Sequence, residues 1–432
     1  MKMEKITQLH PSEQIVEFMN RIYQNAMTTT SGGNLSILDS DGNMWISPGS
    51  VDKGTLRIED IVCVKADGSI EGRHKPSCEY PFHRAIYRRR PDVSAILHAH
   101  SPALVSYSII GGLPDTNITP LTAKVCQEPG FAPYAVPGSE ALGEKISCCF
   151  SKMYNTILLE NHGTCNAGIS LMQAYKRFET LDFCARMLLG AKHLGKVNSL
   201  SDEQLAEAAV DRNGKFSAAE FEVSSSAERD IRSRMVKLIR RAYSQKLFTS
   251  VCGTYAARVN ADTFIVTPDD IDRATIEESD LVLVKGFEYE AGKELPASAW
   301  LIKKIFDTRS EFNSLIIAAP PSVMAYNITD TKFDPRVIPE SYLLLREMPS
   351  FEFGAYYNSN SVLDTLSMRN PIIMVKNDCV ISSGRTLLES FDRLEVAEYS
   401  ARATIAAVPF GGMKPMNQEQ VAEIVEAFNL IP

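Results

Sequence analysis

The chain has 432 residues, which is too long for one ordinary core and predicts two or three domains at about 100–200 residues each. Its apolar content of 44% and charged content of 23% are typical of a globular protein, and no stretch reaches the roughly 18 apolar residues of a membrane span. The net charge of −8 argues against general affinity for nucleic acid, whose phosphates bind clustered Lys and Arg. We therefore expect neither a nucleic-acid nor a membrane partner.

The N-terminal stretch and the cysteines indicate a cellular compartment. The opening MKMEKITQLHPSEQIVEFMNRIY predicts an amphipathic helix after a Pro-Ser cap and contains no apolar signal region. The nine cysteines, an odd number without CxxC spacing, do not resemble a disulfide framework or a zinc ribbon. We expect reduced thiols and a cytoplasmic location.

Strand-like and helical stretches alternate along the first half. The expected helices are EQIVEFMNRIYQNAM (13–27) and MQAYKRFETLDFCARML (172–188). The expected strands are MWISP (44–48), DIVCVK (60–65) and AILHAH (95–100). Interleaved strands and helices predict an α/β fold, with a sheet covered by helices.

The chain contains an internal repeat. Residues 33–65, GNLSILDSDGNMWISPGSVDKGTLRIEDIVCVK, align without a gap on residues 253–285, GTYAARVNADTFIVTPDDIDRATIEESDLVLVK, at an offset of 220. The same offset carries 75–102 onto 295–322, where little is retained beyond a proline and the apolar rhythm. A repeat of this length indicates two copies of one domain.

A later match completes the second copy. Residues 155–168, NTILLENHGTCNAG, align on 370–384, NPIIMVKNDCVISSG, with an indel. We predict domains at 1–198 and 227–432, joined by a linker at 199–226 that starts with a capped helical stretch and ends in small polar residues.

Four residues of the first half form a candidate metal site. His98 and His100 lie one residue apart in a strand, where residues i and i+2 point to the same side and can offer two nitrogens to one ion. Glu79 stands near the start of a helix, and His162 follows an apolar strand. Each is ordinary by itself, as a strand-edge histidine or a helix-start carboxylate. Together they form a ligand set suited to Zn²⁺, with another divalent transition metal left open.

Six short stretches carry a resemblance to a known family. GGNLS, ISPGS, KPSCE, HAHSP, APYAVPGS and NHG occur in this order, and the chain resembles the class II aldolase/adducin family, of the L-fuculose-1-phosphate aldolase type. The resemblance covers roughly 8–195 and 228–412. It implies two tandem three-layer α/β/α sandwiches, each around a mostly antiparallel mixed sheet, and it places the zinc ligands at the same four positions.

The resemblance also implies an activity. It predicts a zinc-dependent aldolase that cleaves or forms a carbon–carbon bond in a small sugar or sugar phosphate through a metal-stabilised enediolate. Glu79 is then both a ligand and the general base. Two alternatives stay open: a dehydratase or epimerase of ketose phosphates on the same metal site, and a non-enzymatic adducin-like assembly module.

A phosphate pocket is predicted from backbone amides and hydroxyls that can face an anion. Its candidate residues are Gly33, Asn34, Ser47, Gly49, Ser50, Ser77 and Cys78. The chain departs from the aldolase pattern here, because Cys78 replaces the second serine of Pro-Ser-Ser-Glu and the order Ser-Pro-Gly-Ser replaces Thr/Ser-Pro-Thr/Ser-Gly. The tyrosine that serves the fuculose enzyme as general acid has no counterpart in 114–122.

The second copy has lost the ligands. At the offset of 220, Ala299 stands opposite Glu79, and the looser match puts Asp378 opposite His162. Ala318 and Pro320 stand opposite the other two histidines. We therefore predict a degenerate second domain that lacks a metal site.

The family resemblance implies four-fold rings with active sites between neighbouring domains. A tandem chain reproduces such a ring with two chains, so we expect a homodimer that forms a pseudo-tetrameric ring. In this arrangement Tyr342 and Arg346 of the second domain are candidates for the missing acid or an anion contact, against the alternative that both simply lie on a helix surface.

Overall fold

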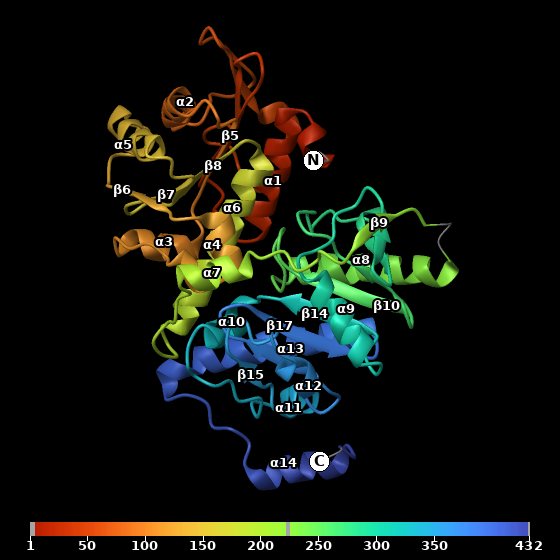
Figure 1. Cartoon of the computed structure of the whole chain (residues 1–432). Helices are drawn as coiled ribbons and strands as arrows, with labels where there is room; N and C mark the ends of the chain where they lie inside the picture. Colours follow the sequence, from red (N-terminus) through yellow and green to blue (C-terminus); the bar gives the residue numbers. More distant parts are fainter. Residues whose placement is uncertain (1–4, 222–224, 431–432) are drawn as a thin grey trace. The chain divides into compact units, whose positions relative to one another are not determined.

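The computed structural model describes residues 5–221 and 225–430. It contains two compact units (Figure 1), of which the first comprises Met1–Thr116 and Thr122–Ala185. The second comprises Asn117–Leu121 and Arg186–Pro432. Within the described ranges, no helix is both long enough and apolar enough to cross a bilayer.

The first unit is built on an eight-stranded sheet with the order β4-β3-β2-β1-β5-β8-β7-β6. Its strands are β1 (Asn34–Leu38), β2 (Met44–Ile46), β3 (Val62–Val64), β4 (Ile70–Glu71), β5 (Ala95–Ala99), β6 (Gly130–Ala132), β7 (Thr156–Leu159) and β8 (Thr164–Gly168). Its helices are α1 (Pro11–Gln24), α2 (Tyr80–Arg89), α3 (Pro102–Ile109), α4 (Pro120–Cys126), α5 (Glu140–Ser151) and α6 (Leu171–Ala191), whose last turns belong to the second unit. Short 3₁₀ helices cover Lys5–Gln8, Ile58–Asp60 and Thr116–Ile118.

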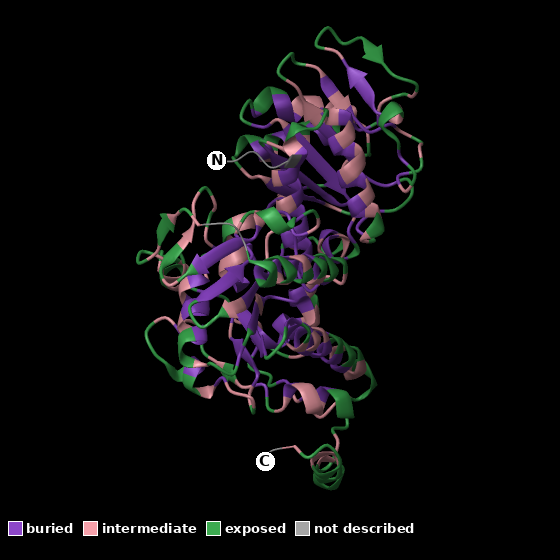
Figure 2. Ribbon diagram, turned by 90° about the vertical axis from the view of Figure 1, so that its right-hand side faces the viewer, coloured by how far each residue is buried: buried purple, intermediate pink, exposed green. Residues whose placement is uncertain are grey.

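Helices cover both faces of this sheet. Helices α2 and α5 bury their apolar sides in one cluster with the strands, including Phe82, Ile86 and Phe150. On the other face α1 packs against β1 and β2, and its Phe18 ring lies 5.1 Å from the Tyr175 ring of α6. Figure 2 shows the strands as the most completely buried layer. Only β6 and β7 pair in parallel, so the predicted mostly antiparallel mixed sheet is confirmed.

The second unit repeats this plan. Its strands are β9 (Ser217–Ala219), β10 (Thr254–Asn260), β11 (Thr263–Val266), β12 (Val282–Lys285), β13 (Glu288–Glu290), β14 (Ser314–Ala318), β15 (Ser350–Phe351), β16 (Ile372–Val375) and β17 (Cys379–Gly384). Its α-helices are α7 (Asp202–Ala208), α8 (Ser226–Ser244), α9 (Ala299–Thr308), α10 (Pro321–Asn327), α11 (Pro339–Leu345), α12 (Ser361–Thr365), α13 (Leu387–Ala407) and α14 (Gln418–Ala427). Two 3₁₀ helices cover Glu278–Asp280 and Val408–Phe410.

The order of the second sheet, β15-β16-β17-β14-β10-β11-β12-β13-β9, is that of the first with one strand added. The added strand β9 comes from the segment predicted as a linker and pairs in parallel with β13 at the sheet edge. Helices α9 and α12 contribute to the apolar cluster of one face. Helices α8 and α13 pack on the other side, against β10 and against β14 and β17.

The strand registers correct the sequence alignment of the two copies. Val64 pairs with Ile70 in the first unit, whereas Val284 pairs with Tyr289 in the second, so the second hairpin is one residue shorter. The offset between the copies therefore falls from 220 to 219 beyond this hairpin. Consistently, α2 ends at the cap residue Arg90 and α9 at Arg309, with nearly identical backbone angles.

The gapless offset of 220 was thus wrong for residues 75–102. Ser298 takes the place of Glu79, because each immediately precedes its helix in the same conformation. Ile317 corresponds to His98, and Ala319 corresponds to His100. The predicted counterparts Ala299, Ala318 and Pro320 were therefore each off by one residue.

Candidate active site

The structure brings the four predicted ligands together. Glu79 is the N-cap residue of α2, His98 lies in β5, and His100 directly follows that strand. His162 lies in the turn that joins β7 to β8. Since β5 is central in the sheet, between β1 and β8, its end forms a rigid platform for the two histidines.

The ligand atoms of these residues converge. His98 Nε2 lies 3.0 Å from His100 Nε2 and 3.3 Å from Glu79 Oε2. Glu79 Oε1 lies 3.6 Å from His162 Nε2. Within the described ranges, the one group of three or more His, Cys, Asp or Glu side chains whose ligand atoms all lie within 4.8 Å is His98, His100 and His162.

The surroundings keep the imidazoles neutral. The backbone oxygen of Thr164 lies 2.9 Å from His98 Nδ1 and can only accept, so this ring carries its proton on Nδ1 and turns the Nε2 lone pair toward the centre. Burial lowers the pKa of His98 and of His100 to about 3, and it also lowers the pKa of His162. Neutral imidazoles are the form that binds a metal ion.

Two observations show that the site fits a cation. Glu79 Oε1 is buried, and no group in the described part of the chain donates a hydrogen bond to it. The nitrogen–nitrogen and nitrogen–oxygen distances are close to the roughly 3.3 Å that separates the ligands of a tetrahedral ion with bonds of about 2.0–2.1 Å. A divalent ion can therefore satisfy the carboxylate and the facing lone pairs together.

Glycine at position 163 allows the close approach of His100. A Cβ at Gly163 would lie 2.5 Å from His100 Cδ2 and 2.6 Å from the Ala99 backbone oxygen, both too close for any real side chain. Gly33 has a φ of +73°, and a Cβ there would lie 2.7 Å from the His98 oxygen. Both glycines shape the backbone around the histidines.

Asn34 approaches the carboxylate from β1. Its amide Nδ2 donates to Glu79 Oε2 at 2.7 Å, and its Oδ1 lies 2.5 Å from His83 Nε2. Burial is complete at His83 and lowers its pKa to about 3. Neither His83 nor its contact with Asn34 was predicted, although the spacing of His83 from Glu79 places both on one side of α2.

The candidate phosphate residues lie on two paired loops. An isolated β-bridge joins Pro48 to Pro76, and Ser77 N donates to Ser47 O at 3.3 Å. The Ser47 hydroxyl is fully buried and accepts from Leu35 N, and the Ser77 hydroxyl accepts from Glu79 N, so these two hydroxyls brace the backbone.

Of the other three candidate phosphate residues on these loops, two are exposed and one packs closely against the facing loop. Ser50 is exposed in a left-handed conformation with a φ of 57°, and Cys78 is exposed. Gly49 lies against the Pro76 oxygen, which a Cβ would approach to 3.3 Å. Sequence reasoning missed the buried Lys53, whose Nζ donates to Pro48 O at 2.6 Å and whose pKa burial lowers to about 8.

Among the residues that the structure describes, the corresponding place in the second unit holds no such ligand group. Asp378 corresponds to His162, because the two residues occupy matching turns. In each turn the backbone N–H donates to the backbone oxygen three residues earlier, and the preceding residue is an asparagine with a φ near 55°. Asp378 is partly buried and accepts a hydrogen bond from the Tyr356 hydroxyl. With Ile317 and Ala319 at the histidine positions, this arrangement supports the predicted degeneracy.

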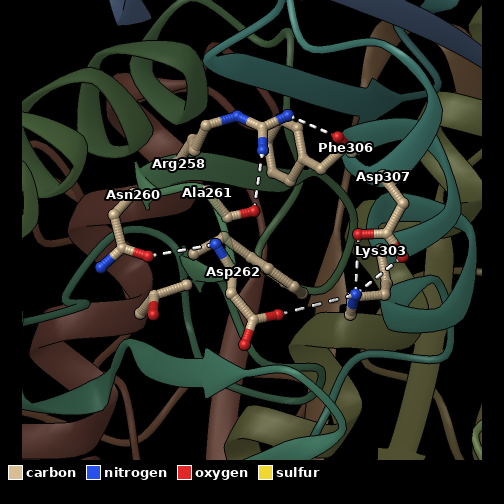
Figure 3. Close-up of a pocket in the computed structure, with 9 residues that line it drawn as sticks. Arg258, Asn260, Ala261, Asp262, Lys303, Phe306 and Asp307 are labelled. Carbon is tan, nitrogen blue, oxygen red and sulfur yellow. Dashed lines mark hydrogen bonds and ion pairs between the residues drawn. The ribbon is translucent and has the colours of Figure 1, made fainter.

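Tyr342 lies in α11 and Arg346 directly follows it, both partly exposed. Their predicted role toward a neighbouring chain stays a prediction. The second unit also has a shallow pocket near the β10–β11 turn (Figure 3), but its charges are already paired. Lys303 Nζ lies 2.7 Å from both carboxylate oxygens of Asp307, and Arg258 donates to backbone oxygens.

Two segments of the chain, residues 13–189 and 233–405, match the family model described as Class II Aldolase and Adducin N-terminal domain. The chain belongs to this family. The predicted tandem duplication is therefore confirmed, as is the predicted α/β fold class with a mixed sheet in each copy.

Two relatives of the chain are named as an aldolase and a decarboxylase. The chain is 30% identical over 198 residues to 5-deoxy-D-ribulose 1-phosphate aldolase of Bacillus thuringiensis serovar kurstaki, covering 45% of this chain and 91% of that protein. It is 34% identical over 201 residues to 3-oxo-tetronate 4-phosphate decarboxylase of Pectobacterium atrosepticum, covering 45% and 90%. The solved structure of YgbL from Klebsiella pneumoniae is 31% identical, with a TM-score of 0.42, and covers 45% of this chain and 96% of that one.

These relatives confirm the prediction of an enzyme of the class II aldolase type. Class II aldolases depend on a metal ion, and the three histidines can hold one.

Proposed function

We propose that the chain is a zinc-dependent lyase that breaks or forms a carbon–carbon bond next to a carbonyl group in a small sugar phosphate. The observation that carries the proposal is the convergence of three neutral imidazoles and Glu79 at the end of β5. The 30% identity to a sugar-phosphate aldolase supports the substrate class.

The residues present would hold the ion through the Nε2 atoms of His98 and His162, a nitrogen of His100 and the Glu79 carboxylate. A bound divalent ion supplies a Lewis acid that disperses negative charge developing on the substrate oxygens. A set of three imidazole nitrogens and one carboxylate favours zinc, and another divalent transition metal is the alternative.

Glu79 moves the proton. In cleavage, an acid–base group other than Glu79 takes the hydroxyl proton of the alcohol carbon, which becomes an aldehyde as the carbon–carbon bond breaks. The electron pair stays on the ketone fragment, and Glu79 Oε1 gives a proton to that carbon; in bond formation Oε1 removes this proton as the base. Oε1 suits this task because Oε2 is already bound by Asn34, while Oε1 faces His162.

Decarboxylation of a phosphorylated 3-oxo acid is a second candidate. It is favoured by the 34% identity to a decarboxylase of this type and by the absence of tyrosine from residues 114–122. An aldol reaction exchanges a proton with an aldehyde oxygen, whereas release of CO₂ needs no such acid. Both candidates break a carbon–carbon bond and use the same metal site.

The substrate pocket would lie at the paired loops 47–50 and 75–78, together with Gly33 and with Asn34, the first residue of β1. We propose Gly49, Ser50 and Cys78 as the residues that face the phosphate. Ser47 and Ser77 support the loops from behind through their hydroxyls. In a two-chain ring, Tyr342 of a second chain would supply the acid, and Arg346 would supply an anion contact.

We also propose that the enzyme works in the cytoplasm. All nine cysteines lie in the described residues, and none is paired in a disulfide. Buried free thiols fit a reducing compartment.

Two variants test the proposal. Glu79→Gln keeps an acceptor for Asn34 but cannot take a proton, so it should retain metal and lose turnover by about 10²–10⁴-fold. His98→Ala should lose the metal as well. The measurements are metal content by mass spectrometry and release of aldehyde or CO₂ from a panel of sugar phosphates and 3-oxo acid phosphates. Full turnover by Glu79→Gln would remove Glu79 as the base.

A further inference from the structure

A continuous row of buried polar side chains ends at Glu79. Asn34 Nδ2 donates to Glu79 Oε2 at 2.7 Å, and Asn34 Oδ1 lies 2.5 Å from His83 Nε2. The Ser36 hydroxyl lies 2.6 Å from His83 Nδ1 and 2.7 Å from the Tyr87 hydroxyl. We call these four residues, Asn34, Ser36, His83 and Tyr87, the polar row.

The chemistry of the groups fixes the direction of these bonds. A carboxylate only accepts, so Asn34 must turn its NH₂ toward Glu79 and its oxygen toward His83. His83 must then carry a proton on Nε2 to donate to that oxygen. With His83 absent, the Asn34 oxygen would lose its donor, and the amide would be held at its Glu79 end alone.

The row is held by two rigid elements. Glu79, His83 and Tyr87 are spaced by four residues and lie on one side of α2. Asn34 and Ser36 are two residues apart in β1, so their side chains face the same side of the sheet. Ser36 and His83 are completely buried, so water cannot replace either one. The position of the Asn34 amide is thus set from behind, through His83.

The second unit shows that the fold does not need this row. The matched strand registers and helix ends put Ala256 in place of Ser36, Ile302 in place of His83 and Phe306 in place of Tyr87. These three residues belong to the apolar cluster of the second unit. Thr254 takes the place of Asn34.

Apolar replacement of a complete buried polar network is close to neutral or stabilising, so stability alone does not explain why the first unit keeps it. The row occurs in the unit that holds the histidine cluster, and it ends on the carboxylate of that cluster. A role at Glu79 explains both facts.

We propose that His83 is a positioning residue for Glu79. By fixing the Asn34 amide, it holds Oε2 and leaves Oε1 as the oxygen that faces His162 and the reacting proton. The catalytic part of this inference rests on the proposed function. The effect on the metal site does not, because the orientation of Glu79 also sets how well the four ligands bind an ion.

Zn²⁺ affinity tests the inference without any substrate. The variants are His83→Ile, which introduces the residue of the second unit, and His83→Gln, whose Nε2 can donate to Asn34 in place of the ring nitrogen. Zn²⁺ is titrated into the full apo chain in competition with a chromophoric chelator. We expect His83→Ile to lose about 10–100-fold in affinity, as for other groups that orient metal ligands, and His83→Gln to regain most of it.

Thr156→Val is the matched control. Thr156 Oγ1 donates to Asn166 Oδ1 at 3.0 Å in an equally buried place, and the second unit has Ile372 at this position. This variant should lower the thermal midpoint and leave Zn²⁺ affinity unchanged. His83→Ile should also lower the midpoint, because Asn34 Oδ1 and the Ser36 hydroxyl lose their partner, so Zn²⁺ affinity is the readout that separates the two variants.

Two results would overturn the inference: wild-type Zn²⁺ affinity in folded His83→Ile, or equal losses in the isoleucine and glutamine variants. If His83→Ile does not fold, Ser36→Ala decides, since reduced affinity supports the row and unchanged affinity overturns it. With an active substrate, His83→Ile should lower kcat more than it changes KM. If the wild type cleaves no test substrate, the proposed function fails, while the Zn²⁺ titration still decides the role of His83.

Discussion

Replacing Asp378 with asparagine should stabilise the second unit at neutral pH. Asp378 is partly buried and accepts a hydrogen bond from the Tyr356 hydroxyl. Burial raises its pKa to about 6, against the opposing effects of the Tyr356 hydrogen bond and of Arg212. Asparagine keeps an acceptor for Tyr356 and carries no charge, so it imitates the protonated acid.

The magnitude follows from the difference between the folded pKa of about 6 and the ordinary value of 3.8. Between these values the folded chain binds more protons than the unfolded chain, so stability falls as pH rises through this window. Each pKa unit corresponds to about 1.4 kcal/mol, which gives a cost of at most about 3 kcal/mol for the ionised Asp378 at pH 7. Asp378→Asn should remove this cost at pH 7 and make little difference near pH 4.

The assay is urea unfolding between pH 4 and 7, followed by tryptophan fluorescence. The chain has two tryptophans, Trp45 in the first unit and Trp300 in the second, so a Trp45→Phe background reports the second unit alone. Asp364→Asn, at an exposed carboxylate of α12, is the control and should show no such pH dependence. A variant at position 378 that is less stable than the parent at pH 7 would refute the reasoning, because it would show that the charge is needed.

Other consequences concern the metal and the assembly. Metal analysis of the purified chain should find one transition-metal ion per chain, and two would contradict the loss of the second site. Sedimentation should give a two-chain particle, whereas a monomer at working concentration would contradict the ring. Gly163→Ala should weaken Zn²⁺ binding, because its Cβ would lie 2.5 Å from His100 Cδ2. Gly214→Ala, with no atom within 4 Å of the added Cβ, is the control, and equal affinities would contradict the tight packing.

The convergence of the four candidate metal ligands could be predicted because each belongs to a local pattern. His98 and His100 follow strand periodicity, Glu79 starts a helix with proline in its first turn, and His162 precedes a glycine at a strand end. These patterns depend on a few neighbouring residues, so the fold brings the ligands together as the sequence indicates.

The alignment of the copies beyond the β3–β4 hairpin could not be settled in the same way. Residues 75–102 and their counterparts share mainly an apolar rhythm, and such a rhythm fits almost as well when it is shifted by one residue. Backbone pairing decides it, because Asn34 pairs with His98 while Thr254 pairs with Ile317. The hydrogen-bonded contact of His83 with Asn34 was also beyond reach, since it joins a helix to a strand 49 residues away.

The duplicated chain separates what the fold requires from what the site requires. Both units keep the same strand order, so the sheet and its covering helices tolerate the loss of all four ligands. The second unit fills the place of His83 with Ile302, and Tyr356 donates a hydrogen bond to the partly buried Asp378 after β16. Polar groups buried without partners are costly, so a unit that loses its metal is expected to lose the row that orients the ligands as well. The joint loss of ligands and row in one copy, and their joint presence in the other, is therefore what we expect if the row serves the site.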